Sequence, residues 1–239
     1  MNDIRDPQSG IRTPRTLVVI PARNESKDIE NVISEVTKTT GFPVLVVDDA
    51  SEDDTAECAR AAGALVMPLA AQLGAWCATQ AGLRYAQQKA FEFVISMDAD
   101  GQHEPGALPG LMNPILENQA DIVIGCCTKR GSKLRQVAWK LMKLVSGLSH
   151  QDLTSGFRVY DRRAIDALVS PEATLLEFQD VGVLFLLQAQ RLRISEVEVD
   201  MPPRTSGISR IFHSWSSVVY YMAYTLLLGA TKRQRRARL

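Results

Sequence analysis

The segment FVISMDADGQH, residues 93–103, is an apolar run that ends abruptly in two carboxylates, Asp98 and Asp100, followed by a glycine. Residues two apart in a β-strand point to the same face, so we expect these side chains to converge on one object beyond the edge of a sheet. Mg²⁺ and Mn²⁺ prefer oxygen ligands and are often held by one or two carboxylates together with a diphosphate. The segment therefore predicts a divalent metal and a phosphorylated substrate. Two solvent-exposed turn aspartates are the alternative, since Asp and Gly are also common in turns.

The composition fits one α/β domain. The chain has 239 residues, of which 46% are hydrophobic, enough for one substantial core. Lys plus Arg (27) balance Asp plus Glu (27), so net charge does not favour nucleic acid as a partner. The four cysteines lack zinc-ligand spacing and the density of a disulfide scaffold. We expect a cytoplasmic protein whose polar residues 1–14, which lack the apolar core of a signal peptide, form a disordered tail.

Strand-like and helix-like segments alternate along much of the chain. Runs of β-branched residues predict strands, and apolar residues spaced three and four apart predict helices. The expected strands cover residues 16–20, 43–47, 64–67, 93–97, 121–125 and 194–199, the last of them as an edge strand. The expected helices cover residues 28–39, 53–62, 75–90, 105–118, 132–148, 163–169 and 182–191. Repeated crossovers of this kind indicate an α/β fold with a mostly parallel central sheet and helices on both faces.

Acidic residues follow three of the expected strands. Glu25, Asp49 and Asp98 each lie just beyond the carboxyl end of a strand. Ligands of open parallel sheets bind beyond this edge. The three side chains are therefore expected to contribute to one site.

Five segments together resemble the family 2 glycosyltransferases of GT-A (Rossmann-like) fold, and within them the dolichyl- or polyprenyl-phosphate mannose synthases and their bacterial relatives. They are VIPARNE (19–25), VDDASEDDT (47–55), DADGQH (98–103), DLTSGFR (152–158), and EVEV leading into RTSGISR (196–199 and 204–210). The resemblance implies a GT-A domain over residues 15–211. It also implies a metal-dependent, inverting transfer of a sugar from a nucleotide-diphosphate sugar, of the GDP-mannose or UDP-hexose type, to a polyprenyl phosphate.

The resemblance implies site residues as well. Those expected around the nucleotide sugar are Pro21, Arg23, Glu25, Val47, Asp49, Asp98, Ala99 and Asp100, and those that match the metal-binding set for Mg²⁺ or Mn²⁺ are Asp98, Asp100 and Gln102. For Asp48 and Asp49 an alternative is open, in which one of them caps the next helix with Ser51 while the other binds ligand. His103 is expected behind the metal ligands or at the surface.

Two arginines, Arg204 and Arg210, flank Gly207 in a pattern similar to the family's basic loop near the diphosphate. A mobile loop with two cations can neutralise a leaving diphosphate and exclude water, so both arginines are expected to be catalytic. The alternative is an ordinary solvated basic loop.

The need for a general base depends on the acceptor. A polyprenyl phosphate is already ionised and needs no strong base, whereas a sugar hydroxyl needs a carboxylate to take its proton. Asp180 resembles the base of relatives that act on sugars. Asp152 is an alternative base that could equally hold the turn that follows it.

The chain departs from the family at GCCT, residues 125–128. Many relatives have Gly-Ser-Arg there, with the arginine touching phosphate or acceptor. Lys129 or Arg130 could substitute for that arginine. Cys126 and Cys127 are expected to pack against the sheet rather than to react.

The C-terminal residues 215–230 are mostly apolar, with aromatic residues near one end, and a basic tail follows them. The run is shorter than the roughly 20 residues that a membrane-spanning helix needs. An amphipathic helix and basic tail over residues 212–239 would instead place the enzyme on the inner face of the cell membrane, next to a lipid-linked acceptor. A packed terminal helix and a homo-oligomer contact are the alternatives.

Other functions compete with this interpretation. The first alternative is a family 2 transferase that adds a sugar to a glycan hydroxyl in cell-surface polysaccharide synthesis. A second is a non-catalytic protein, either a regulator that binds nucleotide sugars or a degenerate partner subunit. The intact set of Asp98, Asp100 and Gln102 argues against degeneration. A nucleotidyltransferase is disfavoured because no glycine-rich, basic loop follows Ile20.

Overall fold

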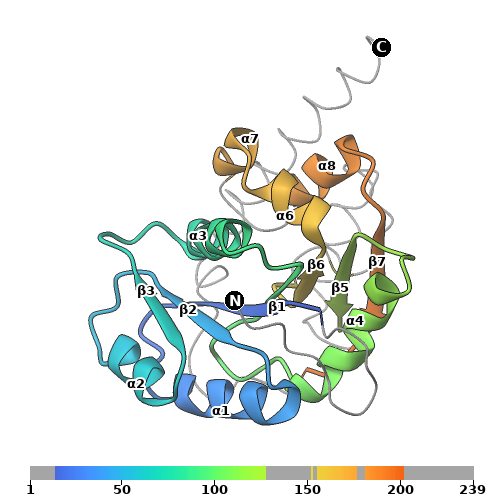
Figure 1. The fold of residues 1–239 in the computed structure, drawn as a ribbon. Helices are drawn as coiled ribbons and strands as arrows, with labels where there is room; N and C mark the ends of the chain where they lie inside the picture. Colours follow the sequence, from blue (N-terminus) through green and yellow to red (C-terminus); the bar gives the residue numbers. More distant parts are fainter. Residues whose placement is uncertain (1–13, 128–151, 153–154, 177–180, 202–239) are drawn as a thin grey trace, which may run out of the picture.

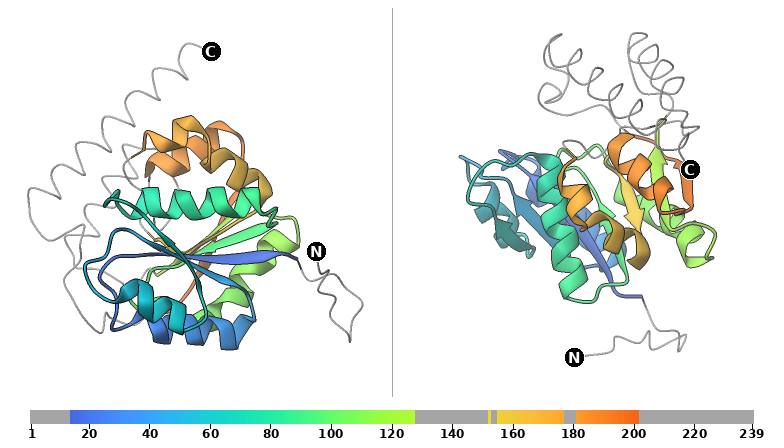
Figure 2. Two further views of the ribbon diagram at one scale, coloured as in Figure 1. Left: turned by 60° about the vertical axis from the view of Figure 1, so that its left-hand side comes forward. Right: turned by 90° about the horizontal axis from the view of Figure 1, so that it is seen from above.

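A seven-stranded β-sheet with helices on both faces forms the centre of the protein (Figures 1 and 2). The computed structural model describes residues 14–127, 152, 155–176 and 181–201. The strands are β1 (Thr16–Ala22), β2 (Val44–Asp48), β3 (Leu65–Pro68), β4 (Phe93–Ser96), β5 (Ile122–Cys126), β6 (Arg158–Tyr160) and β7 (Ile194–Glu198). The helices are α1 (Ile29–Thr40), α2 (Thr55–Ala61), α3 (Ala75–Gln88), the 3₁₀ helix η1 (Pro105–Ala107), α4 (Leu108–Leu116), α6 (Arg162–Leu168), α7 (Pro171–Thr174) and α8 (Val181–Ala189).

The sheet is mostly parallel, as the sequence predicts. Its strand order is β3-β2-β1-β4-β6-β5-β7, and β6 alone runs antiparallel to its neighbours β4 and β5. The strand expected over residues 194–199 is β7, which lies at an edge as predicted. No pattern in the sequence predicts β6, because three residues are too few to show alternation. This strand places the segment 155–158 beside the loop that follows β4.

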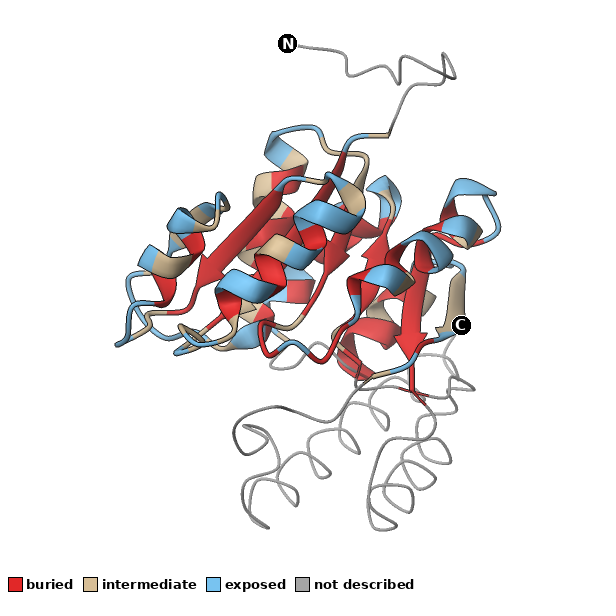
Figure 3. Ribbon diagram, turned by 90° about the horizontal axis from the view of Figure 1, so that it is seen from below, coloured by how far each residue is buried: buried red, intermediate tan, exposed pale blue. Residues whose placement is uncertain are grey.

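Each face of the sheet packs against its own set of helices. Leu17 and Val19 belong to a core shared with α3, α6 and α8, whereas Val18 and Ile20 belong to a core shared with α1, α2 and α4. The central strands are therefore buried on both faces, and the helices expose only their outer sides (Figure 3). Gly82 lets α3 approach β1, because a Cβ at this position would lie 2.3 Å from Val19 Cγ1.

The predicted helices that fall on described residues are present with small shifts at their ends. The helix expected over residues 105–118 begins as η1 and continues as α4 to Leu116. The helices expected over residues 132–148 and 212–239 lie outside the described residues. Within the part of the chain that the structure describes, no helix is long and apolar enough to cross a membrane.

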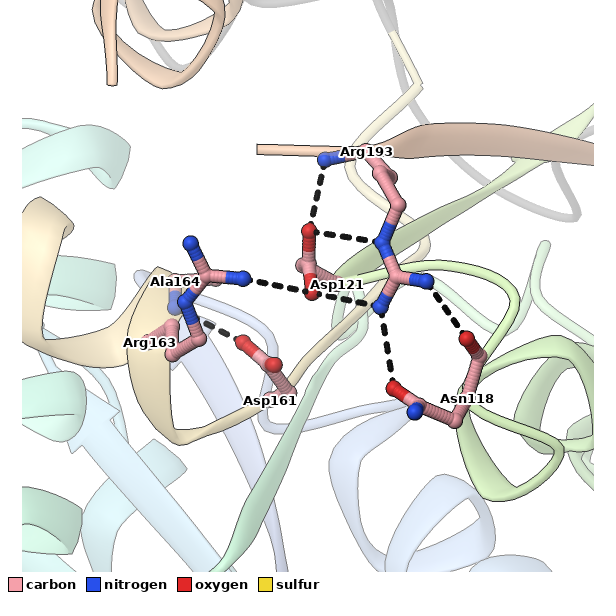
Figure 4. Close-up of polar contacts among 6 residues, drawn as sticks. All are labelled: Asn118, Asp121, Asp161, Arg163, Ala164 and Arg193. Atoms are coloured by element: carbon pink, nitrogen blue, oxygen red, sulfur yellow. Dashed lines mark hydrogen bonds and ion pairs between the residues drawn. The ribbon is translucent and has the colours of Figure 1, made fainter. Parts of the chain in front are cut away.

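A polar cluster joins the amino ends of β5 and β7 (Figure 4). Arg193 binds the buried Asp121 carboxylate through its backbone N–H (2.7 Å) and through Nη2 (2.9 Å), and Arg163 Nη1 lies 3.3 Å from the same carboxylate. The hydrogen bonds from Arg193 outweigh burial and lower the pKa of Asp121. Burial raises the pKa of Asp161, which accepts the Ala164 N–H at the start of α6 (2.8 Å). Because the cluster lies at the amino ends of the strands, we assign it to stability.

Candidate functional site

Three loops meet at the carboxyl ends of the neighbouring strands β2, β1 and β4. The first loop (residues 23–28) follows β1, the second (49–54) follows β2 and the third (97–104) follows β4. The backbone links them to the sheet, since Asp49 N–H donates to Ala22 O (2.8 Å) and Met97 N–H donates to Val19 O (3.1 Å). The sheet order thus brings the three segments that carry Glu25, Asp49 and Asp98 to one edge.

Side chains of the second loop hold the backbone of the first. Asn24 N–H donates to Ser51 Oγ (3.0 Å), and Asn24 Oδ1 accepts the Glu52 N–H in return (2.8 Å). Glu25 N–H donates to Thr55 Oγ1 (2.8 Å). These bonds hold the backbone of the first loop against the segment 51–55.

Asp53 adds a fourth hydrogen bond between these segments. Its Oδ2 accepts the Ser26 N–H (3.2 Å), and its Oδ1 accepts the Thr55 N–H (3.1 Å). Burial raises the pKa of Asp53, but the hydrogen bonds from Thr55 and Ser26 outweigh it, so this pKa lies below its ordinary value. The carboxylate is therefore ionised at neutral pH, which favours both bonds.

Asp49 is buried, and its carboxylate accepts two consecutive backbone N–H groups. Leu73 N–H donates to Oδ1 (2.7 Å) and Gly74 N–H donates to Oδ2 (2.9 Å), directly before α3. Asp48 Oδ1 accepts the Ser51 N–H (3.2 Å) and its hydroxyl. The alternative in which one of these aspartates caps the following helix is wrong, because α2 begins after Asp54 and has no side-chain cap.

The other residues expected around the nucleotide divide into two groups. Pro21, Arg23 and Glu25 are partly exposed at the edge of the sheet, and Arg23 lies 3.5 Å from Glu52 Oε1. Val47 and Ala99 are buried in the two cores. Val47 and Ala99 therefore support the loops by packing in the hydrophobic cores.

The carboxylates of the third loop do not lie in a strand. Strand β4 ends at Ser96, so Asp98 and Asp100 occupy the following turn, in which Gly101 adopts a left-handed conformation (φ 71°). The Asp98 side chain is 46% exposed. Asp100 is only 5% exposed, and its Oδ1 accepts the N–H of the equally buried Gln102 (3.1 Å). The prediction that Asp98 and Asp100 lie on one face of a strand is therefore wrong, because β4 ends before them. The alternative of two exposed turn aspartates is also wrong, because Asp100 is buried.

His103 lies directly behind Asp98. Its buried ring accepts the Asp98 N–H at Nδ1 (2.9 Å), and Nε2 lies 3.6 Å from Asp98 Oδ2. The ring stacks on Phe157 with 4.7 Å between centroids and 9° between planes. The surface position that the sequence left open for His103 is wrong.

Gly156 and Ser96 complete the surroundings of Asp98. A Cβ at residue 156 would lie 2.7 Å from Asp98 Oδ1, and Ser96 Oγ donates to Gly156 O (2.6 Å). No local pattern in the sequence predicts a separate role for Gly156 or Phe157. The family-like segment 152–158 was the available signal, but its position beside Asp98 depends on β6.

The donor set fits a hard cation bound together with a diphosphate. Asp98, Asp100 and Gln102 offer carboxylate and amide oxygens, the ligand type that Mg²⁺ and Mn²⁺ prefer. Among the described residues no group of three or more His, Cys, Asp and Glu side chains could hold a metal ion. Mg²⁺ is commonly held by only one or two carboxylates, with substrate phosphates and waters as its other ligands.

The cysteines pack against the sheet, as predicted. Cys126 and Cys127 are both buried. Burial, together with the nearby charges of Glu196 and Asp152, raises the pKa of Cys126 to about 11, so the thiol stays protonated at neutral pH. Asp152 is itself buried, and its N–H donates to Glu196 Oε1 (3.0 Å).

Several expected functional residues lie outside the described residues. They are Lys129, Arg130, Asp180, Arg204, Arg210 and the C-terminal aromatic and basic residues. Their roles stay predictions from the sequence.

Comparisons with known proteins agree with the architecture. A family model described as "Glycosyl transferase family 2" matches residues 17–169. The chain is 32% identical to an undecaprenyl-phosphate mannosyltransferase from Micrococcus luteus, over 82% of this chain and 87% of the relative. It is 28% identical to a polyprenol monophosphomannose synthase from Mycolicibacterium smegmatis, over 68% of each.

A solved structure shares the fold. It is glucosyl-3-phosphoglycerate synthase from Mycobacterium tuberculosis in complex with Mn²⁺, uridine diphosphate and phosphoglyceric acid. The TM-score is 0.70 and the sequence identity 21%, and the match covers 92% of this chain and 78% of that one.

Proposed function

Since the chain belongs to glycosyl transferase family 2, we propose that it transfers a sugar from a nucleotide-diphosphate sugar to a polyprenyl phosphate. It is an enzyme of GT-A fold, as the sequence indicates. The observation that carries the proposal is the half-exposed Asp98, which shares one loop with the buried Asp100 and Gln102, at the sheet edge that also carries the first two loops.

The first and second loops form the proposed nucleotide site. Arg23 and Glu25 are partly exposed there, and a carboxylate can accept hydrogen bonds from a base N–H or a ribose hydroxyl. Hydrogen bonds between the loops fix their backbones in advance, which lowers the entropic cost of binding. Asp49 contributes by holding Leu73 and Gly74 against the site.

Asp98, Asp100 and Gln102 would hold Mg²⁺ or Mn²⁺ with the donor diphosphate. A cation at this position supplies electrostatic stabilisation of the charge that grows on the departing diphosphate. The solved relative that contains Mn²⁺ and uridine diphosphate supports this choice. Arg204 and Arg210 are proposed to neutralise the same diphosphate.

The acceptor is proposed from the names of two relatives, an undecaprenyl-phosphate mannosyltransferase and a polyprenol monophosphomannose synthase. The oxyanion of a polyprenyl phosphate is already a nucleophile, so no general base is required. The proposed helix and basic tail over residues 212–239 would hold the enzyme at the membrane that contains such a lipid. Transfer to a glycan hydroxyl, with Asp180 as base, is the second candidate.

A labelled-donor assay tests the proposal. Purified enzyme is given radiolabelled GDP-mannose, UDP-glucose or UDP-N-acetylglucosamine, with either undecaprenyl phosphate or a soluble glycan, in Mn²⁺ or in EDTA. We expect label in the organic extract with one donor, only in Mn²⁺, and at least about a hundredfold less with Asp100→Asn.

The matched control is Glu35→Gln, which changes an exposed carboxylate on α1 outside the three loops and should keep full activity. Equal transfer in EDTA would contradict the metal. Label that enters only the soluble glycan would contradict the lipid acceptor and support the second candidate, transfer to a glycan hydroxyl.

A further inference from the structure

The buried imidazole of His103 contacts both the backbone and the carboxylate of Asp98. Nδ1 accepts the Asp98 N–H at 2.9 Å, and Nε2 lies 3.6 Å from Asp98 Oδ2. A ring nitrogen that accepts a hydrogen bond carries no proton, so the neutral ring carries its proton on Nε2, the atom that faces the carboxylate. One side chain therefore restrains the main chain and the side chain of Asp98 together.

The His103 ring is held in turn by the segment that leads into β6. It stacks on Phe157, which is completely buried. Phe157 N–H donates to Ser155 Oγ (3.2 Å), and the buried Arg158 donates from Nε to Ser155 O (2.8 Å). The His103 ring therefore packs on the segment 155–158, whose conformation is held by its own hydrogen bonds.

The backbone of Gly156 forms the other wall beside Asp98. A Cβ at residue 156 would lie 2.7 Å from Asp98 Oδ1, and Ser96 Oγ binds Gly156 O at 2.6 Å. The carboxylate is thus confined between an imidazole and a backbone, although 46% of the side chain is exposed. Without these walls, a half-exposed aspartate would sample several rotamers.

We propose that His103 is a positioning residue that holds the Asp98 carboxylate in the orientation in which it binds the cation and the donor diphosphate. This inference rests on the proposed function. Groups that orient metal ligands typically change metal affinity by ten- to a hundredfold when they are removed. The stack of His103 on Phe157 also joins the third loop to the segment 155–158. The position of that segment therefore affects where the Asp98 carboxylate lies.

The test compares three substitutions in the full-length protein. His103→Phe keeps a ring that can stack on Phe157 but has no nitrogen. His103→Asn loses the stack but places an acceptor oxygen near the position of Nδ1. Glu104→Ala, which changes an exposed neighbour, is the matched control.

Two quantities are measured for each variant. Free Mn²⁺ is titrated by electron paramagnetic resonance with UDP or GDP present, and the melting temperature is followed by circular dichroism. We expect His103→Phe to keep its melting temperature within about 5 °C, to bind Mn²⁺ about tenfold more weakly, and to lose kcat rather than KM for the acceptor. His103→Asn should recover part of the affinity, and Glu104→Ala should match the wild type.

Two results would overturn the inference in distinguishable ways. Wild-type affinity for Mn²⁺ in His103→Phe would overturn the positioning role and leave the proposed function intact. A wild-type protein that binds no Mn²⁺ with either nucleotide would overturn the proposed metal site and the positioning role with it.

Discussion

Gly156 lies directly against the carboxylate of Asp98, with room for a hydrogen but not for a methyl group. A Cβ at residue 156 would stand 2.7 Å from Asp98 Oδ1 and 3.3 Å from its Cγ. Ser96 fixes the Gly156 carbonyl through its hydroxyl (2.6 Å), so the backbone cannot easily move away. The absence of a side chain at Gly156 thus determines where the Asp98 carboxylate can lie.

Gly156→Ala should displace the Asp98 carboxylate. We expect transfer to fall about tenfold or more, with a loss of less than about 1 kcal/mol in the free energy of unfolding, because the methyl meets the end of a half-exposed side chain that can turn toward solvent. Activity assays and urea denaturation measure the two effects. Gly110→Ala is the control, since its Cβ would meet nothing within 4 Å and Ala favours a helix. Full activity in Gly156→Ala would show that the Asp98 position is not critical.

Asp121→Ala should destabilise the fold without changing the site. The variant loses a buried carboxylate that binds Arg193, so we expect the free energy of unfolding to fall by on the order of 2 kcal/mol near neutral pH. Because the pKa of Asp121 is lowered in the fold, its contribution is complete above the ordinary value of 3.8 and disappears as pH falls through the lower folded value.

Urea denaturation of the wild type and of Asp121→Ala at several pH values measures this difference. Glu57→Ala, which removes an exposed partner of Arg60, is the control and should cost less than about 0.5 kcal/mol. A wild-type advantage that grows on acidification would contradict the assigned sign.

Arg204→Ala should lower turnover much more than affinity for a nucleoside monophosphate. A cation that stabilises the leaving diphosphate acts mainly in the transition state, so its removal costs on the order of 3 kcal/mol in the activation free energy. Steady-state kinetics and calorimetry with the monophosphate separate the two effects. Arg60→Ala, at an exposed position on α2, is the control. Unchanged turnover would leave the 204–210 loop without a catalytic role.

Deleting residues 231–239 should weaken binding to anionic liposomes. The deletion removes five cations, Lys232, Arg233, Arg235, Arg236 and Arg238, each of which contributes about 1 kcal/mol near an anionic surface. Co-sedimentation should therefore fall with the deletion and with added salt, whereas calorimetric binding of the donor stays the same. Neutral liposomes provide the control. Full-length protein that ignores anionic liposomes at low salt would contradict membrane attachment.

Much of the fold follows from local sequence pattern. The strands β1, β2 and β4 are short apolar runs, and α1 buries Ile29, Val32, Ile33 and Val36 at the spacing of one helix face. Polar residues directly after the strands were enough to predict which edge of the sheet carries the site, because parallel strands end on one side. The family-like segments added the reaction type, which periodicity alone does not contain.

By itself, the sequence determined the alternation of strands and helices, the edge at which Asp49 and Asp98 lie, and the family. Only the tertiary structure decided that Asp49 binds the loop before α3, that Asp100 is buried, and that His103 stacks on Phe157. The physical reason is that periodicity arises between residues a few positions apart, whereas burial and hydrogen-bond partners depend on segments far apart in the chain. Strand β6, which pairs with β4 and β5, is what brings residues 156 and 157 to the third loop.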